Sequence, residues 1–289
     1  MNFELFKNEP MSKHTTFRTG GNAEVYYKIY NREGLVEVLD ICKDMGVKPL
    51  IIGNGSNLLV SDKGISIPVI DLRSAFEEIK IEGNNLYAGA GAVLSKVSTA
   101  AYENSLSGLE FAFGIPGTVG GAVYMNAGAY NGEIKDIAVS VDIFRNGKFE
   151  TVTAEEMSFS YRHSMAMEGD VIIIGVTCGL KKGDKEEIKK MMDDFTERRR
   201  SKQPLEYPSA GSTFKRPEGF FAGKLIMDSG LAGKEIGGAM VSPKHCGFII
   251  NHNNATSKDV YDLIRYVQDE VYNKFGVMLE TEVKLIGEF

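Results

Sequence analysis

The sequence predicts an α+β fold, in which helices and strands are grouped along the chain and do not alternate as regular βαβ units. Three observations support this class. One helical pattern comes early and is followed by a long stretch of short apolar strands. Two longer helical patterns stand apart in the C-terminal half. Two glycine-rich segments interrupt the strands, as expected where backbone approaches another group closely.

The first expected elements are a strand and a helix. Alternating residues predict a strand from 23 to 29, after the segment Thr16-Phe17-Arg18-Thr19-Gly20-Gly21. Apolar residues at helical spacing predict a helix over 33–45, which Gly46 can end. The run Leu50-Ile51-Ile52 then enters like a buried strand.

A polar glycine turn follows this strand, and apolar residues resume at 58–60. Strand, turn and strand together have the layout of an anion-binding nest. The turn is neither a Walker loop, since no Gly-Lys-Ser/Thr follows, nor a Rossmann fingerprint, since no GxGxxG opens a helix. A glycine-rich hairpin is the alternative. The turn consists of Gly53, Asn54, Gly55, Ser56 and Asn57.

The middle of the chain is rich in short strands, with one short helix expected over 95–104. Strands are expected at 65–72, 79–81, 86–88, 137–144, 148–152 and 171–179.

The second glycine-rich segment runs from Gly114 to Tyr130. Its glycines and its proline predict neither a stable helix nor an ordinary strand. Apolar residues interleave with the glycines and favour burial, which argues against the alternative of a mobile surface loop. Glycine N–H groups without a side chain suit a diphosphate or a flat cofactor ring. We therefore interpret 114–130 as a ligand-cradling segment.

The C-terminal half begins with a helix from Asp184 to about Arg200, with Asp184 and Glu187 as a capping-box-like start. The stretch 203–208 contains proline and indicates a linker, so we expect a domain boundary there. A strand over 247–250 and a long helix starting at Thr256 follow. An alternating strand from 277 to 286 closes the fold.

Composition excludes several classes of protein. The 289 residues are enough for two modest domains, and the net charge of −6 argues against a nucleic-acid or anionic-membrane partner. No apolar run approaches the roughly 20 residues that span a bilayer, and the N-terminus lacks a signal pattern. Cys42, Cys178 and Cys246 are far apart and odd in number, which predicts a reducing cytoplasm. The four histidines and these cysteines form no metal spacing.

Three polar residues could carry chemistry. Arg162 presents a planar fork that suits oxyanions. Ser212 lies among small residues next to two cations and could give a proton to a developing carbanion. Glu282 shares a strand face with Glu280, opposite Leu279 and its alternating neighbours. A surface arginine, a loop serine and a solvated strand face are the ordinary alternatives.

Taken together, the motifs resemble the UDP-N-acetylenolpyruvoylglucosamine reductases, flavoenzymes of bacterial cell-wall synthesis. The resemblance covers nearly the whole chain, and many motifs occur in the right order. They are 16–21, 53–59, 114–130, Tyr161-Arg162-His163-Ser164, 208–217, 222–226 and 279–283.

The resemblance implies an FAD-binding domain of the vanillyl-alcohol-oxidase-like (PCMH) kind over 1–204, made of two subdomains split near residue 72. It implies a substrate-binding domain over 205–276, with the strand 277–289 returning to the first domain. FAD would be bound without a covalent bond, its diphosphate at 53–57. Further cofactor-binding residues would be Gly114, Ile115, Pro116, Gly117, Thr118, Gly120, Gly121, Asn126, Ala127 and Gly128.

The resemblance also implies three catalytic positions, Arg162, Ser212 and Glu282. NADPH reduces FAD, and hydride then passes to the terminal vinyl carbon of UDP-N-acetylglucosamine enolpyruvate. Arg162 and Glu282 would stabilise the resulting enolate, and Ser212 would protonate the carbon. The product, UDP-N-acetylmuramate, is a peptidoglycan precursor.

Substrate contacts are expected at Tyr161, Lys215 and Arg216, the last two with the UDP diphosphate. Forty-nine residues separate Arg162 from Ser212, which suits the shorter subtype that lacks a tyrosine-bearing loop over the nucleotide. Another group must then hold the UDP. Two other functions stay open: an oxidase of the same fold, and a UDP-sugar-binding protein without catalysis.

Overall fold

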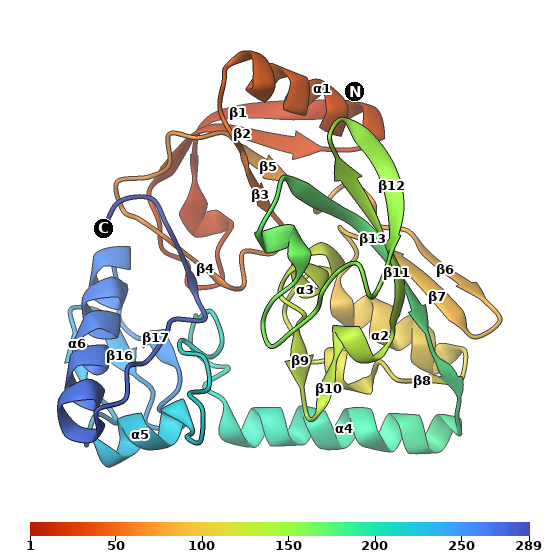
Figure 1. Cartoon of the computed structure of the whole chain (residues 1–289). Coiled ribbons are helices and arrows are strands. Elements are labelled where there is room, and N and C mark those ends of the chain that lie inside the picture. The colour runs from red at the N-terminus through yellow and green to blue at the C-terminus, as the bar shows by residue number, and fades with distance from the viewer. The chain divides into compact units, whose positions relative to one another are not determined.

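The computed structural model describes residues 1–289 and divides them into two compact units (Figure 1). The first unit contains Met1–Leu5, Tyr26–Asn54 and Pro68–Arg199. The second contains Phe6–Val25, Gly55–Ile67 and Arg200–Phe289. Because the N-terminal half contributes two segments to the second unit, these bounds differ from a cut at residue 204. The domain limits expected from the sequence stay a prediction.

The first unit holds a five-stranded sheet and part of a four-stranded one, whose strands β1 and β2 each continue into the chain segment 6–25 of the second unit. The smaller has the strand order β1-β2-β5-β3, with β5 parallel to both β2 and β3. Helix α1 is capped by Asn31, whose side chain accepts the N–H of Gly34 at 2.9 Å. These elements are β1 (Phe3–Pro10), β2 (Asn22–Ile29), α1 (Arg32–Asp44), β3 (Leu50–Ile52) and β5 (Val69–Asp71).

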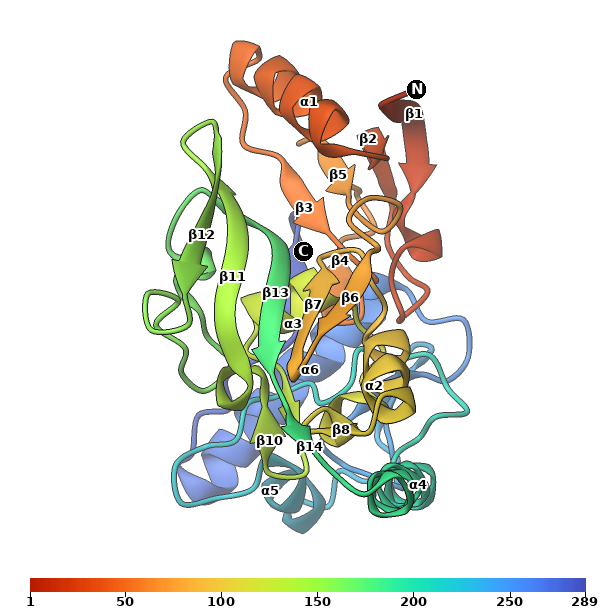
Figure 2. The same cartoon turned by 90° about the vertical axis from the view of Figure 1, so that its right-hand side faces the viewer.

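The larger sheet has five antiparallel strands in the order β12-β11-β13-β7-β6 (Figure 2). Its apolar face and the neighbouring helices enclose the core of this unit. The strands are β6 (Ile79–Glu82), β7 (Asn85–Gly89), β11 (Ala138–Arg145), β12 (Lys148–Thr153) and β13 (Val171–Gly179). Around them lie α2 (Leu94–Glu103), α3 (Val119–Tyr124), α4 (Lys185–Lys202) and two short pairs, β8 (Leu106–Ser107) with β14 (Lys181–Lys182) and β9 (Gly128–Ala129) with β10 (Gly132–Glu133).

Helix α3 corrects one expectation, because it forms inside the segment 114–130, where no helix was predicted. Val119 and Val123 are almost fully buried on one face of this short helix. Tertiary burial therefore outweighs the entropy that the two glycines at 120 and 121 lose on ordering. The capped start of α4 is confirmed, since the Asp184 carboxylate accepts the N–H groups of residues 186 and 187.

The second unit packs α5 (Ala222–Asp228) and α6 (Ser257–Phe275) with a three-stranded antiparallel sheet. The helix predicted to start at Thr256 is present and begins with a capping box, in which the Thr256 hydroxyl accepts the Asp259 N–H at 3.1 Å. The sheet consists of β15 (Glu235–Ile236), β16 (Ala239–Val241) and β17 (Ile249–Asn251), and β4 (Leu58–Val60) pairs in parallel with β18 (Lys284–Ile286).

The closing strand is shorter than predicted, since only β18 at its end is regular. The preceding residues bond to an irregular neighbour: Lys215 N–H donates to the Glu280 carbonyl, and Glu282 N–H to the Thr213 carbonyl. The alternation itself holds, because Leu279 and Val283 are buried. No helix of this structure has the length and apolar character needed to cross a membrane.

Candidate functional site

The first half of the glycine turn lies against the start of α3. A Cβ on Gly53 would come within 2.2 Å of the Thr118 hydroxyl oxygen. The Asn54 amide donates to the Pro116 carbonyl at 3.1 Å. Both contacts are within the first unit, so the structure brings together two segments that the sequence singled out independently. Only glycine at position 53 leaves this approach free.

The second half of the turn belongs to the second unit. Gly55 has a left-handed φ of 59°, and a Cβ there would lie 1.9 Å from the His14 carbonyl oxygen. The N–H of Thr16 donates to the Gly55 carbonyl at 3.4 Å. The hydroxyl of Thr16 and that of Thr19, three residues further on, are buried and have no hydrogen-bond partner in the structure. Orphaned buried donors of this kind fit a polar ligand held at the turn.

Several backbone N–H groups of the segment 114–130 are already bonded within the protein. Gly120 donates to Ala90 and Ile115 to Ala112. Ala127 donates to the carbonyl of Ala122. At these positions a ligand along the segment would therefore be stabilised by close packing against the backbone and not by hydrogen bonds from these N–H groups.

Arg162 lies in a tight turn closed by two hydrogen bonds of 3.1 Å between Ser160 and His163. Its φ of 56° is in the left-handed region, which costs energy for a residue with a Cβ. Its guanidinium donates to the Gly128 carbonyl at 3.2 Å and lies 5.1 Å from the centre of the Tyr161 ring. The structure thus places this predicted arginine against the end of the 114–130 segment.

Asn126 connects the two parts of this arrangement. It is fully buried and has a left-handed φ of 42°. Its amide donates to Glu133 at 2.8 Å and to the Ser160 carbonyl at 2.9 Å, and its oxygen accepts the Lys135 N–H. A residue predicted to contact a cofactor therefore acts here as a fixed support for the Arg162 turn.

Ser212 and Glu282 come together in the second unit through Thr213. Thr213 is buried; its N–H donates to the Gly247 carbonyl, and its carbonyl accepts the Glu282 N–H, both at 2.8 Å. Ser212 is exposed and Glu282 half-buried. Residues separated widely in sequence thus occupy neighbouring backbone positions, and Ser212 is accessible to a ligand.

Lys215 and Arg216 follow on the same segment. Lys215 forms an ion pair with Glu280 at 3.0 Å. The Arg216 guanidinium stacks 4.0 Å from the centre of the Phe221 ring and donates to the Phe220 carbonyl at 3.3 Å. Both cations are partly exposed, which leaves them accessible to an anionic ligand.

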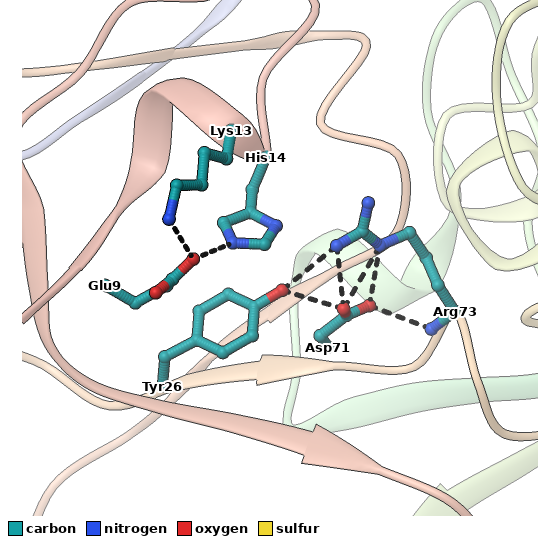
Figure 3. A network of polar contacts seen from close by, with 6 residues as sticks. All are labelled: Glu9, Lys13, His14, Tyr26, Asp71 and Arg73. Atoms are coloured by element: carbon teal, nitrogen blue, oxygen red, sulfur yellow. Dashed lines mark hydrogen bonds and ion pairs between the residues drawn. The ribbon is translucent and has the colours of Figure 1, made fainter. Parts of the chain in front are cut away.

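A buried polar network was missed by sequence reasoning (Figure 3). The Asp71 carboxylate, 2% exposed, accepts the Tyr26 hydroxyl at 2.7 Å and two nitrogens of Arg73 at 2.9–3.1 Å. Burial and the adjacent carboxylate raise the pKa of Tyr26, so its hydroxyl stays a donor. Asp71 pairs with Ile52, directly before Gly53, so the network fixes the strand that enters the turn. The signal was an acidic residue within the apolar run 69–72.

A second network in Figure 3 belongs to the other unit. Glu9 accepts from Lys13 at 3.4 Å and lies 3.0 Å from the His14 ring nitrogen. His14 is the residue whose carbonyl faces Gly55. No group of three or more His, Cys, Asp or Glu side chains is arranged to hold a metal ion.

Two family descriptions match this chain. Residues 23–153 match "FAD binding domain", and residues 203–286 match "UDP-N-acetylenolpyruvoylglucosamine reductase, C-terminal domain". The first contains Gly53, the α3 segment and the network around Asp71. The second contains Ser212, Thr213 and Glu282.

Similar full-length proteins carry the same enzyme name. A UDP-N-acetylenolpyruvoylglucosamine reductase of Agathobacter rectalis is 50% identical, covering 99% of this chain and 95% of its own. One from Clostridium perfringens is 51% identical over 98% of this chain and 93% of its own. The crystal structure of the reductase from Thermus caldophilus is 36% identical with a TM-score of 0.86, covering 99% of this chain and all of the other.

Proposed function

The chain belongs to the UDP-N-acetylenolpyruvoylglucosamine reductase family, and on that premise we propose that it reduces UDP-N-acetylglucosamine enolpyruvate to UDP-N-acetylmuramate for peptidoglycan synthesis. It is an oxidoreductase that uses FAD and takes its electrons from NADPH. One observation carries the assignment: the backbone bond between Thr213 and Glu282, here called the Thr213 junction, brings Glu282 next to the Ser212 segment. It does so in a chain that is similar to these reductases over 99% of its residues.

The residues around the glycine turn fit FAD. Gly53 and Gly55 let the turn pack directly against Thr118 and the His14 carbonyl, and the buried Thr16 and Thr19 hydroxyls offer unused donors. We assign the diphosphate to residues 53–57 and the rest of the cofactor to 114–130. Bound FAD supplies hydride transfer from NADPH to the terminal vinyl carbon of the substrate. Its binding is expected to be non-covalent.

We assign to Arg162 the role of stabilising the negative charge that builds on the substrate carboxylate as the hydride arrives. Its guanidinium fork donates two hydrogen bonds to an oxyanion, and the bond to Gly128 fixes its direction beforehand. The buried Asn126 supports the same turn. This arrangement favours the enolate over the ground-state carboxylate because negative charge on the carboxylate oxygens increases as the hydride arrives.

Ser212 is assigned as the proton donor to the carbon next to the carboxylate. Hydride addition to the terminal carbon leaves an electron pair on that carbon, and the serine O–H proton completes the new C–H bond. Glu282, whose N–H donates to the Thr213 carbonyl, is assigned to share a proton with the enolate. Tyr161, Lys215 and Arg216 remain candidate contacts for the UDP-sugar.

A cytoplasmic location is proposed as well. The three cysteines are buried and unpaired, as expected in a reducing compartment. The substrate and NADPH are both small and charged, and no nucleic-acid partner is expected from the net charge of −6.

An anaerobic two-step titration tests the function. The bound flavin is bleached with one equivalent of NADPH, and UDP-N-acetylglucosamine enolpyruvate is then added without oxygen. We expect the yellow absorbance to return rapidly and UDP-N-acetylmuramate to form in equal amount. Recovery only after air is admitted would identify an oxidase. A purified protein without flavin would favour a binding protein.

A further inference from the structure

The last turn of α4 carries three arginines whose surroundings differ. Arg198 pairs with Asp194 at 2.9 Å on the exposed face of the helix. Arg200 is exposed. Arg199 is half-buried and makes neither an ion pair nor a hydrogen bond with another residue. It is the arginine of this turn that is withdrawn from water without an anion to balance it.

Arg199 lies against the start of the 114–130 segment. A Cβ on Gly114 would come within 3.0 Å of the Arg199 Cδ and 3.5 Å of a terminal nitrogen. Tyr130, at the other end of the segment, stacks on Phe195 one helical turn before Arg199, with ring centres 4.4 Å apart. Its hydroxyl also donates to the Phe195 carbonyl at 3.1 Å. Figure 1 shows the β9–β10 hairpin beside α4.

Burial without a counter-charge is unfavourable for a guanidinium. It lowers the pKa of Arg199, and the nearby polar group that opposes this effect is the Tyr130 hydroxyl, not a carboxylate. A favourable contact with the helix C-terminus does not explain this placement, because exposed Arg198 and Arg200 provide it without desolvation. The position instead suits a charge that is balanced when an anion binds.

We propose that Arg199 binds the diphosphate of the nucleotide that enters beside the 114–130 segment, the UDP-sugar during the oxidative half-reaction and NADPH during the reductive one. The guanidinium fork matches two phosphate oxygens, and Gly114 leaves it room to reach them. The FAD diphosphate is already assigned to residues 53–57, so the entering nucleotide is the remaining diphosphate. This inference rests on the proposed function and supplies a group that holds the UDP.

The test measures binding of UDP and of uridine to the flavin-loaded protein by calorimetry. Arg199→Met keeps the apolar stem, and Arg199→Lys keeps the charge without the fork. Arg198→Met is the matched control, since it removes one positive charge from the same helix turn. We expect Arg199→Met to weaken UDP binding about 10- to 100-fold and Arg199→Lys to weaken it less. Uridine binding and the control should stay within about twofold.

The outcomes separate this inference from the proposed function. If the unaltered protein binds no UDP, the proposed function itself fails. If it binds UDP and Arg199→Met binds UDP equally well, the proposal for Arg199 is wrong. Loss of FAD from Arg199→Met, measured by flavin fluorescence, with normal UDP binding after reloading, would assign the guanidinium to the cofactor and also overturn it.

Discussion

The side-chain amide of Asn57 donates a 3.0 Å hydrogen bond to the backbone carbonyl of Glu282, 225 residues further along the chain. The Lys284 N–H returns a bond of 2.9 Å to the Asn57 carbonyl. The second half of the glycine turn and the segment that carries Glu282 are therefore clamped together. Strand β18 continues this clamp as the parallel partner of β4. Asn57 therefore holds the backbone of a residue assigned to catalysis.

The first prediction concerns this clamp. Asn57→Ala removes the side-chain bond to Glu282 and is expected to destabilise the protein by about 1 kcal/mol. It should also lower both FAD affinity and turnover, because the turn and Glu282 move together. Asn104→Ala is the control, since it removes a bond of the same kind, to the Ala100 carbonyl, at the exposed C-terminal end of α2. Equal effects of the two variants on FAD affinity, measured by fluorescence titration, would contradict this role.

The second prediction separates the two half-reactions. Ser212→Ala is expected to leave bleaching of the flavin by NADPH near normal and to slow its reoxidation by substrate by about 10²- to 10⁴-fold. The reason is that the serine proton is needed only when the substrate carbon is reduced. Stopped-flow absorbance under nitrogen measures both steps. Ser229→Ala, which removes a hydroxyl bonded within α5, should change neither. Equal slowing of both steps would exclude the proton-donor role.

The third prediction concerns the shape of Arg162. Arg162→Lys keeps the charge but loses the fork that serves both Gly128 and an oxyanion. We expect the rate at which substrate reoxidises the flavin to fall by at least about tenfold, which is the effect of removing one hydrogen-bond donor to a developing charge. Arg145→Lys, in an exposed ion pair with Glu150, is the control. A lysine variant with near-normal reoxidation would show that Arg162 does not contact the enolate.

Local patterns predicted the parts of the fold that depend on few neighbours. The caps at Asp184 and Thr256 and the turn after β3 depend on residues close in sequence, and each is present. Arg73 lies only two residues from Asp71, but the third member of this network was not visible in the sequence, because Tyr26 reaches Asp71 only once β2 and β5 pair. The backbone before β18 is irregular for a similar reason, because its hydrogen bonds to Thr213 and Lys215 form only in the folded protein.

The candidate site shows a similar limit. Sequence motifs singled out Arg162, Ser212 and Glu282, but the support of Arg162 by Asn126 and the Thr213 junction are tertiary contacts. Arg199 lies in a run of three arginines at 198–200, and the sequence pattern alone does not separate it from its two neighbours. Its partial burial and its contact with Gly114 distinguish it from Arg198 and Arg200.

The last prediction tests why glycine is required in the turn. Gly55 and Gly219 both have a left-handed φ, 59° and 75°, and both lie in the second unit. Replacing either by alanine costs about 1 kcal/mol for the backbone conformation alone. A Cβ on Gly55 also meets the His14 carbonyl oxygen at 1.9 Å, whereas one on Gly219 has no atom within 4 Å. Gly55→Ala should therefore destabilise the protein by at least about 2 kcal/mol more.

Urea unfolding of the flavin-free protein measures this difference without any contribution from the cofactor. Removing FAD first matters because a ligand that binds the folded state stabilises it and would mix affinity with strain. In the FAD-loaded protein, Gly55→Ala should in addition lower the affinity for flavin. A backbone forced away from His14 no longer holds residues 53–57 in the conformation assigned to the FAD diphosphate. If the two alanine variants unfold at the same urea concentration, the close approach at Gly55 is not what requires glycine there.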